Sequence, residues 1–338
     1  MAARAGRHTA APELRRRAFL RQYAMKVLIT GGAGFIGAAL ARAHLERGDA
    51  VTIVDNLVTG RREQVPDGAQ FHLLDVGSPA LEDCFEVAGP FDVVSHYAAL
   101  KDVRRALVDP YPDAEANILG TLNVLRCAAG HGTGLFVFPS SAAVYGDAQR
   151  FPTPETAPAA PISPYGISKA AAEAYCAFFA RNRSLPAVAL RYSTVYGPTA
   201  TEESEAGVIT NFTRRLLAGR APIIYGDGEQ TRDLVSVDDV VRANLLAIER
   251  GPRPWAVYNV ATGVETSVND LCRTLAALTG FQGRSEYQDA KPGEVRRNVQ
   301  DASLIRRDLG WAPSVSLKDG LARVVEAYRQ QPASVAGD

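Results

Sequence analysis

The sequence predicts an α/β fold in which a doubly wound parallel sheet carries a smaller C-terminal α/β lobe. Short apolar runs alternate with helical patterns from Met25 to about Leu190. Such alternation is typical of a parallel sheet with helices on both faces. The length of 338 residues suits about two domains of roughly 150 residues each. We expect the sheet over residues 25–191, with some later segments returning to it, and the lobe over residues 192–330.

Several apolar runs are expected to be buried strands, because parallel strands covered on both faces read as continuous apolar stretches. They cover residues 26–30, 50–54, 70–74, 93–96, 135–139 and 187–191. Helical patterns cover residues 36–47, 114–129, 165–182, 208–218, 238–248 and 267–279. Ser267 is of the type that caps a helix start, which supports the last of these helices.

Charge and composition exclude several classes of protein. The 37 basic and 37 acidic residues give zero net charge, so we expect no binding to nucleic acid. No apolar run approaches the roughly 18 residues of a membrane span. The four cysteines form no close pair, so we expect neither a disulfide framework nor a zinc site, and a cytoplasmic location. The five histidines show no i, i+4 spacing, and no metal site is expected.

Residues 1–24 have a different composition from the rest of the chain. Six arginines accompany a single acidic residue, Glu13. We expect a disordered extension, because such arms are commonly solvated. A transit peptide or a polyanion-binding arm is the alternative. Met25 begins the first predicted strand and would make a natural start of the folded protein.

The motif Gly-Gly-Ala-Gly-Phe-Ile-Gly at residues 31–37 follows the first strand and opens a helix. Gly31 permits a tight turn, Gly34 lets the backbone approach a pyrophosphate, and Gly37 permits close packing of helix on strand. Asp55 ends the second strand, where a carboxylate can bind an adenosine ribose and repel a 2′-phosphate. The pattern predicts a Rossmann-type dinucleotide site that prefers NAD to NADP. The arginine pair at 61–62 could instead pair with a 2′-phosphate, although a solvated loop is the simpler interpretation.

Three further residues indicate catalysis. Ser141 follows the strand at 135–139, and Tyr165 and Lys169 are spaced i, i+4 on one helix face. A nearby ammonium and a nicotinamide cation should lower the pKa of Tyr165 toward neutrality. A phenol in that state can take a proton from a sugar hydroxyl and return it, and Ser141 can hydrogen-bond the same oxygen.

Together these motifs resemble the extended short-chain dehydrogenase/reductase family of nucleotide-sugar epimerases and dehydratases, and within it the UDP-galactose 4-epimerase branch. The resemblance runs from Met25 to about Tyr328. Further matching segments lie at residues 55–57, 75–76, 97–101, 117–121, 232–239, 258–263 and 291–295.

The resemblance implies a role for each matching residue. The cofactor-binding residues would be Gly31, Gly34, Phe35, Ile36, Gly37, Asp55, Asn56, Gly60, Asp75, Val76, Ala98, Ala99, Lys101, Asn117, Tyr165 and Lys169. The substrate-binding residues would be Lys101, Ser141, Ala142, Ala143, Tyr165, Tyr192, Thr194, Val208, Tyr225, Arg232, Lys291 and Glu294. Ser141, Tyr165 and Lys169 would be catalytic.

Departures from the family pattern reduce the number of reactions that we expect and widen the range of possible substrates. Dehydratases of the family carry an acidic pair where this chain has Ala142 and Ala143, and methyl groups can neither expel a hydroxyl nor take a C5 proton. Typical 4-epimerases carry asparagine at Thr194 and arginine at Lys291. Lysine neutralises phosphate without the bidentate fork of arginine, so a nucleotide or sugar other than that of UDP-galactose is an open alternative.

The resemblance therefore implies a 4-epimerase of a nucleotide-activated sugar, with tightly bound NAD, acting through a transient 4-keto sugar. UDP-hexoses are the first guess. UDP-glucuronate or an ADP-, GDP- or TDP-linked hexose or heptose is the alternative, as is reduction of a nucleotide 4-ketosugar. A non-catalytic NAD-binding scaffold is disfavoured by the intact catalytic residues. A homodimer is expected, with the long helices near 114–129 and 165–182 at its interface. The apolar stripe of Ala171, Tyr175, Phe178 and Phe179 could instead be internal core.

Overall fold

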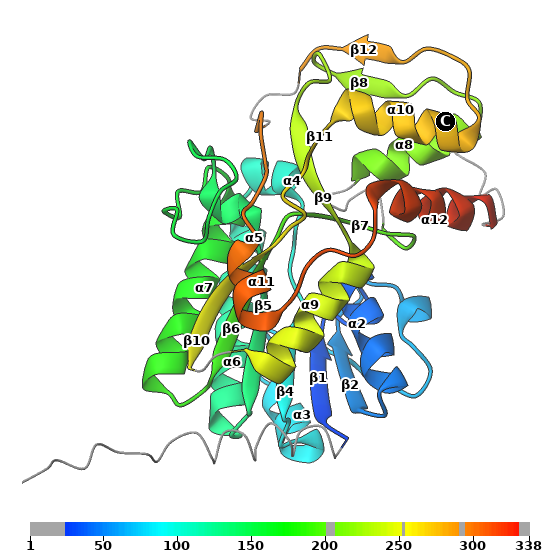
Figure 1. Ribbon diagram of the computed structural model, residues 1–338. Helices are drawn as coiled ribbons and strands as arrows, with labels where there is room; N and C mark the ends of the chain where they lie inside the picture. The colour runs from blue at the N-terminus through cyan, green and yellow to red at the C-terminus, as the bar shows by residue number, and fades with distance from the viewer. Residues whose placement is uncertain (1–23, 201–206, 252–253, 291–294, 331–338) are drawn as a thin grey trace, which may run out of the picture.

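In the computed structural model, which describes residues 24–200, 207–251, 254–290 and 295–330, a seven-stranded parallel sheet forms the centre of the protein (Figure 1). Its strand order is β10-β6-β5-β4-β1-β2-β3. The strands are β1 (Lys26–Thr30), β2 (Ala50–Asp55), β3 (Gln70–Leu73), β4 (Val93–His96), β5 (Leu135–Ser141), β6 (Ala187–Tyr192) and β10 (Trp255–Val260). The predicted fold class is confirmed. Strand β10 was not among the predicted strands; it pairs with β6 from far along the chain.

Alternate residues of each central strand face opposite helical layers, as a strand repeat of two requires. Val27 and Ile29 of β1 belong to a core shared with α2 (Phe35–Glu46), α9 (Val237–Arg250) and α11 (Ser303–Leu309). Leu28 belongs to the core on the other face. The helices of that second core are α3 (Leu81–Ala88), α6 (Gly120–Gly130) and α7 (Pro164–Asn182). Both faces of the sheet are therefore buried.

The helix predicted over residues 114–129 begins earlier and is not uniform: it runs from α5 (Tyr111–Ala114) through a π-helical segment, Glu115–Leu119, into α6. A further short helix, α4 (Val103–Val108), precedes it. A π-helical segment changes the direction in which side chains project, and such segments are frequent at functional sites. This one faces the cavity described below.

The smaller lobe has its own apolar core. Three helices enclose it: α8 (Gly207–Leu217), α10 (Val268–Thr279) and α12 (Leu317–Gln330). Ser267 caps α10 by accepting a hydrogen bond from the Asp270 amide, as predicted. The short strands are β7 (Thr194–Tyr196), β8 (Ile223–Tyr225), β9 (Thr231–Ser236), β11 (Glu265–Ser267) and β12 (Glu286–Gln288). Figure 1 shows this lobe above the sheet, with α9 running from one to the other.

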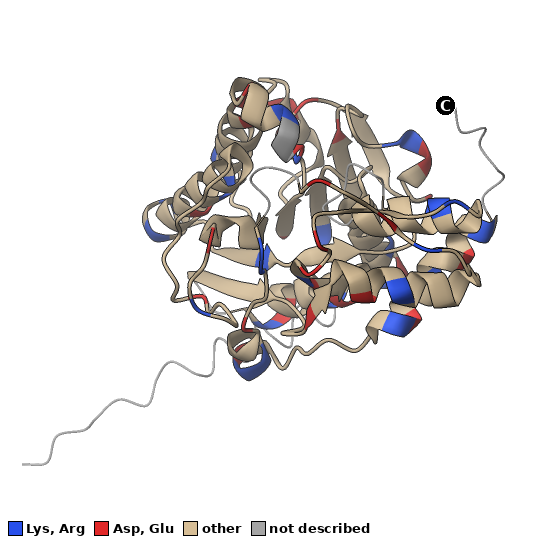
Figure 2. Ribbon diagram, turned by 90° about the horizontal axis from the view of Figure 1, so that it is seen from above, with Lys and Arg blue, Asp and Glu red and all other residues tan. Residues whose placement is uncertain are grey.

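Charged side chains of both signs are spread around the molecule (Figure 2), in keeping with the balanced composition. In the described part of the chain, no helix is both long and apolar enough to cross a membrane. The Arg-rich extension predicted over residues 1–24 lies outside the described residues, except for Ala24.

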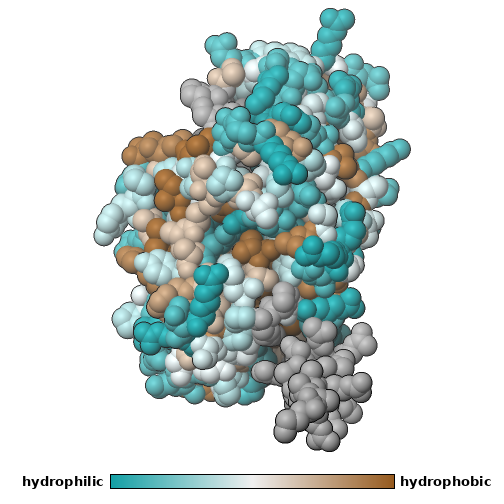
Figure 3. Space-filling model, turned by 60° about the vertical axis from the view of Figure 1, so that its left-hand side comes forward, coloured by the Kyte–Doolittle hydropathy of each residue, from teal (hydrophilic) through white to brown (hydrophobic). Residues whose placement is uncertain are grey.

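Apolar side chains are exposed on α7 and on the short helices beside it. Ile167, Tyr175 and Phe178 of α7 are exposed, as are Val108 and Tyr111. Figure 3 shows apolar side chains gathered on this side of the molecule. Part of the predicted stripe therefore faces outward, while Phe179 packs against the core between the sheet and α7.

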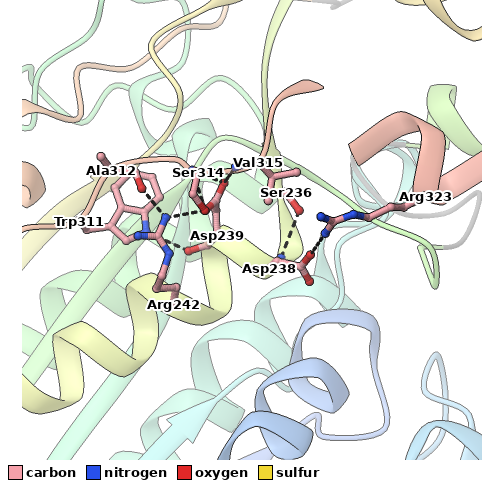
Figure 4. A network of polar contacts seen from close by, with 9 residues as sticks. All are labelled: Ser236, Asp238, Asp239, Arg242, Trp311, Ala312, Ser314, Val315 and Arg323. Atoms are coloured by element: carbon pink, nitrogen blue, oxygen red, sulfur yellow. Dashed lines mark hydrogen bonds and ion pairs between the residues drawn. The ribbon is translucent and has the colours of Figure 1, made fainter. Parts of the chain in front are cut away.

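A buried carboxylate at the start of α9 anchors the chain that leads to α12 (Figure 4). Asp239 accepts hydrogen bonds from the backbone amides of Ser314 and Val315 and from the Arg242 guanidinium. Although burial raises the pKa of Asp239, these bonds outweigh it and hold the pKa below its usual value. The Trp311 indole donates to the Asp239 carbonyl at 2.9 Å. The lobe and the sheet are thus tied together through one helix end.

Candidate active site

A glycine turn between β1 and α2 leaves room for a ligand. Gly31 has a φ of 68°, and a Cβ there would lie 2.4 Å from the Ala98 amide nitrogen. A Cβ on Gly37 would lie 2.3 Å from the Gly31 carbonyl oxygen. Since real side chains never approach so closely, both positions require glycine. The N-terminus of α2, with its unpaired N–H groups, then faces the space beside Gly34.

The Asp55 carboxylate shapes the adjoining loop. It accepts hydrogen bonds from the Ala33 amide at 3.0 Å and from the Leu57 amide at 2.8 Å. Arg62 stacks on the Phe71 ring at 4.6 Å and is not among the residues that line the cavity. The acidic group, rather than an arginine, therefore borders the position of an adenosine ribose. This arrangement fits NAD and disfavours a 2′-phosphate.

These elements border a cavity of about 690 Å³ at the carboxyl ends of the central strands, where doubly wound sheets bind their ligands. The predicted cofactor residues that line it are Gly31, Gly34, Phe35, Ile36, Gly37, Asp55, Asn56, Asp75, Val76, Ala98, Ala99, Lys101, Tyr165 and Lys169. Asn117 and Gly60 lie behind its wall. Asn117 exchanges two hydrogen bonds with the backbone of Leu100, and a Cβ on Gly60 would lie 2.8 Å from Asp55 Oδ1.

Several lining residues were not predicted. They include Val58, Thr59, Gly77, Ser78, Pro112, Glu115, Ala116, Leu119, Pro139, Ser140 and Val195. Those just after β2 and β3, and Pro139 and Ser140 in the last residues of β5, could have been found from their place at a strand end. Pro112, Glu115, Ala116 and Leu119 belong to α5 and the π-helical segment, and no sequence signal used above marks that segment.

Helix α7 places Tyr165 and Lys169 beside the end of β5. Ser163 caps the helix by accepting a hydrogen bond from the Gly166 amide at 3.1 Å. Lys169 Nζ donates to the Pro139 carbonyl oxygen at 2.8 Å and lies 5.8 Å from the centre of the Tyr165 ring. The ammonium therefore lies between the strand end and the phenol. A cation there favours the ionised form of the phenol.

Ser141 is the last residue of β5 and opens the turn that follows. Its Oγ accepts a hydrogen bond from the Ala143 amide at 3.1 Å. A Cβ on Gly166 would lie 2.6 Å from the Ala143 carbonyl oxygen. The first turn of α7 thus packs directly on the turn that carries Ser141, Ala142 and Ala143. The three predicted catalytic residues are brought together by β5 and α7.

Two other tyrosines line the cavity, but both are engaged in a closed ring of hydrogen bonds. The Tyr97 hydroxyl donates to Asn244 Oδ1 at 2.8 Å, and Asn244 Nδ2 donates to the Tyr192 hydroxyl at 2.8 Å. The two hydroxyls are 2.7 Å apart. Burial raises the pKa of Tyr97 and of Tyr192. Neither phenol is suited to act as a base, which leaves Tyr165.

His96 is also unsuited to acid–base chemistry. Burial and the nearby charge of Lys169 lower the pKa of His96 to about 3. Its ring nitrogens are hydrogen-bonded to Thr30 and Thr121 at 2.7 and 2.9 Å. Among the described residues, no three His, Cys, Asp or Glu side chains form a group that could hold a metal ion.

Of the predicted substrate residues, Lys101, Tyr165 and Tyr192 line the cavity. The other described ones are not among its lining residues: Ser141, Ala142, Ala143, Thr194, Val208, Tyr225 and Arg232. Arg232 Nη1 donates to the carbonyl oxygens of Thr231 and Val295, each at 2.8 Å. Thr194 begins β7, and Tyr225 ends β8. Val208 lies in α8 and packs on the lobe core. Lys291 and Glu294 lie outside the described residues.

Asp233 is buried and lies next to Arg232 on β9. Its hydrogen bonds connect β9 to the segments that follow the sheet strands β6 and β10. It accepts hydrogen bonds from the Thr262 hydroxyl at 2.6 Å and from the Gly263 amide at 2.8 Å. The Ser193 hydroxyl donates to it at 3.4 Å. Ser193 immediately precedes β7, so this contact links the start of β7 to β9.

Comparison with known proteins agrees with this geometry. The profile of the NAD dependent epimerase/dehydratase family matches residues 27–261. A putative UDP-glucose 4-epimerase of Methanocaldococcus jannaschii is 39% identical over 302 residues, which cover 88% of this chain and 97% of that protein. The structure of a UDP-glucose 4-epimerase of Thermotoga maritima with UDP-glucose is similar, with a TM-score of 0.87, 42% identity, and coverage of 90% of this chain and 99% of that chain. A Thermus thermophilus UDP-glucose 4-epimerase in complex with NAD has a TM-score of 0.85, 36% identity and coverage of 90% and 99%.

Proposed function

The chain belongs to the NAD dependent epimerase/dehydratase family, and from this we propose that it is an NAD-dependent 4-epimerase of a nucleotide-activated sugar, with UDP-hexoses as its substrates. The observation that carries the proposal is the position of Tyr165, which lines the same cavity as Lys169 and the glycine turn. The relatives named UDP-glucose 4-epimerase support the nucleotide and the sugar class.

The residues around the cavity fit NAD. The glycine turn and the N-terminus of α2 would hold the pyrophosphate, Asp55 the adenosine ribose, and Lys169 the nicotinamide ribose. Bound NAD supplies a reversible hydride acceptor for C4 of the sugar. Tyr165 would take the proton of the C4 hydroxyl and later return it, while Ser141 holds the same oxygen through a hydrogen bond. Because the proton and the hydride both return, no external acid or base is consumed.

The lobe would hold the nucleotide while the sugar turns to present its other face. Arg232, on β9, would bind the ribose or diphosphate, since a guanidinium forks well onto phosphate. Ala142 and Ala143 stand where a dehydratase needs acidic groups. They provide no acid to expel a C6 hydroxyl, so epimerisation is favoured over dehydration.

The first experiment is incubation of the purified protein with UDP-galactose, without added cofactor, while UDP-glucose is followed by NMR. We expect interconversion, because NAD is regenerated in each cycle and need not leave. If bound NAD is present but no sugar converts, the UDP-hexose assignment fails, and ADP-, GDP- and TDP-sugars and UDP-glucuronate are tested next. Stoichiometric consumption of added NADPH would instead indicate a 4-ketosugar reductase.

Tyr165→Phe tests the assigned base. The variant removes only the phenolic hydroxyl, so it should fold and retain NAD while losing about 10²–10⁴-fold in kcat, the usual contribution of a positioned base. The matched control is Tyr175→Phe, an exposed position on the same helix. Turnover at the wild-type rate in Tyr165→Phe would exclude Tyr165 as the base.

The exposed apolar side chains of α7 support a homodimer. Ile167 is 53% exposed and Phe178 is 47% exposed, and a second copy of the chain would remove both from water. Light scattering should give twice the mass of 36.2 kDa, and Phe178→Arg should give a monomer. A monomeric wild-type protein at micromolar concentration would refute the dimer.

The four cysteines are free and buried, which supports a reducing location such as the cytoplasm.

A further inference from the structure

Asp113 is a buried acidic residue beside the proposed active site that no step above uses. It lies in α5 and is only 4% exposed. Its Oδ2 accepts a hydrogen bond from Asn117 Nδ2 at 2.8 Å. Asn117 Nδ2 also contacts Ser168 Oγ at 3.3 Å, and the Ser168 hydroxyl donates to the Tyr165 carbonyl oxygen at 2.9 Å. The carboxylate is therefore joined through two side chains to the first turn of α7.

Asp113 also lies within the electrostatic reach of Lys169. Burial holds the pKa of Asp113 above its usual value, although the charge of Lys169 and the hydrogen bond from Asn117 act in the opposite direction. A carboxylate is costly to bury without a partner. Lys169 is itself buried, at 5% exposed, and its positive charge favours the ionised form of Asp113, so the two charges offset each other's burial.

The other charged groups near α5 are less able to play this part. Helix α5 packs against α4, the π-helical segment and α7. The charged or titratable side chains described on these elements are Arg105 on α4, Glu115 on the π-helical segment, and Tyr165, Lys169, Glu173, Tyr175, Cys176 and Arg181 on α7. Arg105, Glu115 and Arg181 are exposed and are screened by water and salt. Glu173 is paired with Arg191 at 2.6 Å.

We propose that Asp113 is a positioning residue of the 4-epimerase, which acts as the buried counter-anion of Lys169 and thereby sets the proton affinity of Tyr165. The inference rests on the proposed function. An unopposed ammonium would hold the phenolate so strongly that it would be a weak base. A nearby carboxylate offsets part of that field and keeps the phenol effective near neutral pH. The hydrogen bonds through Asn117 and Ser168 hold the Asp113 carboxylate at a fixed position relative to Tyr165.

The test is Asp113→Asn in the protein as purified, without substrate, followed by ultraviolet absorbance of the ionised phenol against pH. Subtraction of the Tyr165→Phe titration isolates Tyr165. The midpoint should fall by about 1 pH unit, the size expected when one nearby negative charge no longer opposes the phenolate. In the pH dependence of turnover, the midpoint of the acidic limb should shift to lower pH by the same amount. The raised pKa values of Tyr97, Tyr145 and Tyr192 keep those groups out of the titrated range.

Two variants control for charge and for structure. Asp109→Asn makes the same charge change at an exposed site on the neighbouring helix end, and should leave the midpoint where it is in wild type. Asp113→Glu keeps the charge and should also restore the wild-type midpoint. If the asparagine variant does not fold, Asp113→Ser removes the same charge with a smaller side chain.

An unchanged absorbance midpoint in a folded, charge-neutral variant at position 113 would overturn the inference, whether or not stability falls. Failure of the proposed function has a different signature, because the wild-type protein would then turn over none of the nucleotide sugars while the absorbance titration still reports on Tyr165.

Discussion

Asn244→Leu should destabilise the protein, because it breaks the ring of hydrogen bonds that joins Tyr97 and Tyr192 to α9. Asn244 is fully buried. Its amide accepts from Tyr97 at 2.8 Å and donates to Tyr192 and to the Val240 carbonyl oxygen, each at 2.8 Å. Leucine has nearly the same volume but neither accepts nor donates, so the change isolates the polar contribution.

The expected cost follows from which groups lose their partners. Val240 O lies at the i−4 position and keeps its helical hydrogen bond. The two hydroxyls keep their mutual contact of 2.7 Å, but one buried O–H is left without an acceptor and the other oxygen loses a donor. A buried polar group without a partner costs about 1–3 kcal/mol. We therefore expect the free energy of unfolding to fall by about 2–3 kcal/mol.

The assay is urea unfolding at a fixed, saturating NAD concentration, since NAD binding itself adds stability. The decisive comparison is with the triple variant Tyr97→Phe, Tyr192→Phe and Asn244→Leu. Removing all partners at once leaves no orphaned hydroxyl, and such replacements are nearly neutral, so the triple variant should be more stable than Asn244→Leu alone. If the triple variant is no more stable than the single one, the loss comes from packing and the hydrogen-bond argument is wrong.

Two further perturbations test buried charges. Glu173→Gln leaves the Arg191 guanidinium buried without its anion, and should lower the free energy of unfolding by about 3–5 kcal/mol; thermal unfolding at the wild-type temperature would contradict this. For Asp49, burial acts to raise its pKa, but hydrogen bonds from His44 and the Met25 amide outweigh it and hold the pKa below its usual 3.8. A carboxyl with a lowered pKa stabilises the fold above the unfolded value, and that stabilisation is lost as pH falls through the folded value. The stability difference between wild type and Asp49→Asn should therefore be constant at neutral pH and shrink below about pH 4; a difference that persists in acid would refute the assignment.

The parts of the site that follow strand ends were predictable from local sequence. Gly31, Asp55 and Ser141 each stand at or just beyond a buried strand, and parallel strands bring their carboxyl ends to one edge. Tyr165 and Lys169 share a helix face because of their i, i+4 spacing. Local pattern and chain direction therefore predict that these residues gather at one edge of the sheet, without knowledge of side-chain contacts.

The contacts that support those residues were not predictable, because they join positions far apart in the chain. Tyr97 and Asn244 meet across 147 positions of sequence, and strand β10 reaches the sheet only by pairing with β6. Periodicity indicates that such residues are buried, but not which of the other buried residues they touch. That depends on how helices pack on the sheet, which long-range burial of apolar surface determines.

For this protein the sequence by itself determined the dinucleotide turn after the first strand, the strand-end positions of Asp55 and Ser141, and the shared helix face of Tyr165 and Lys169, because each is encoded within a few consecutive residues. Only the tertiary structure decided that two neighbouring tyrosines are locked by Asn244, that Asp113 lies buried within reach of the charge of Lys169, and that the helix before α6 is broken by a π-helical segment. These features depend on the packing of distant elements against one another, in which the free energy of burying a polar group is recovered only when its partner is already in place.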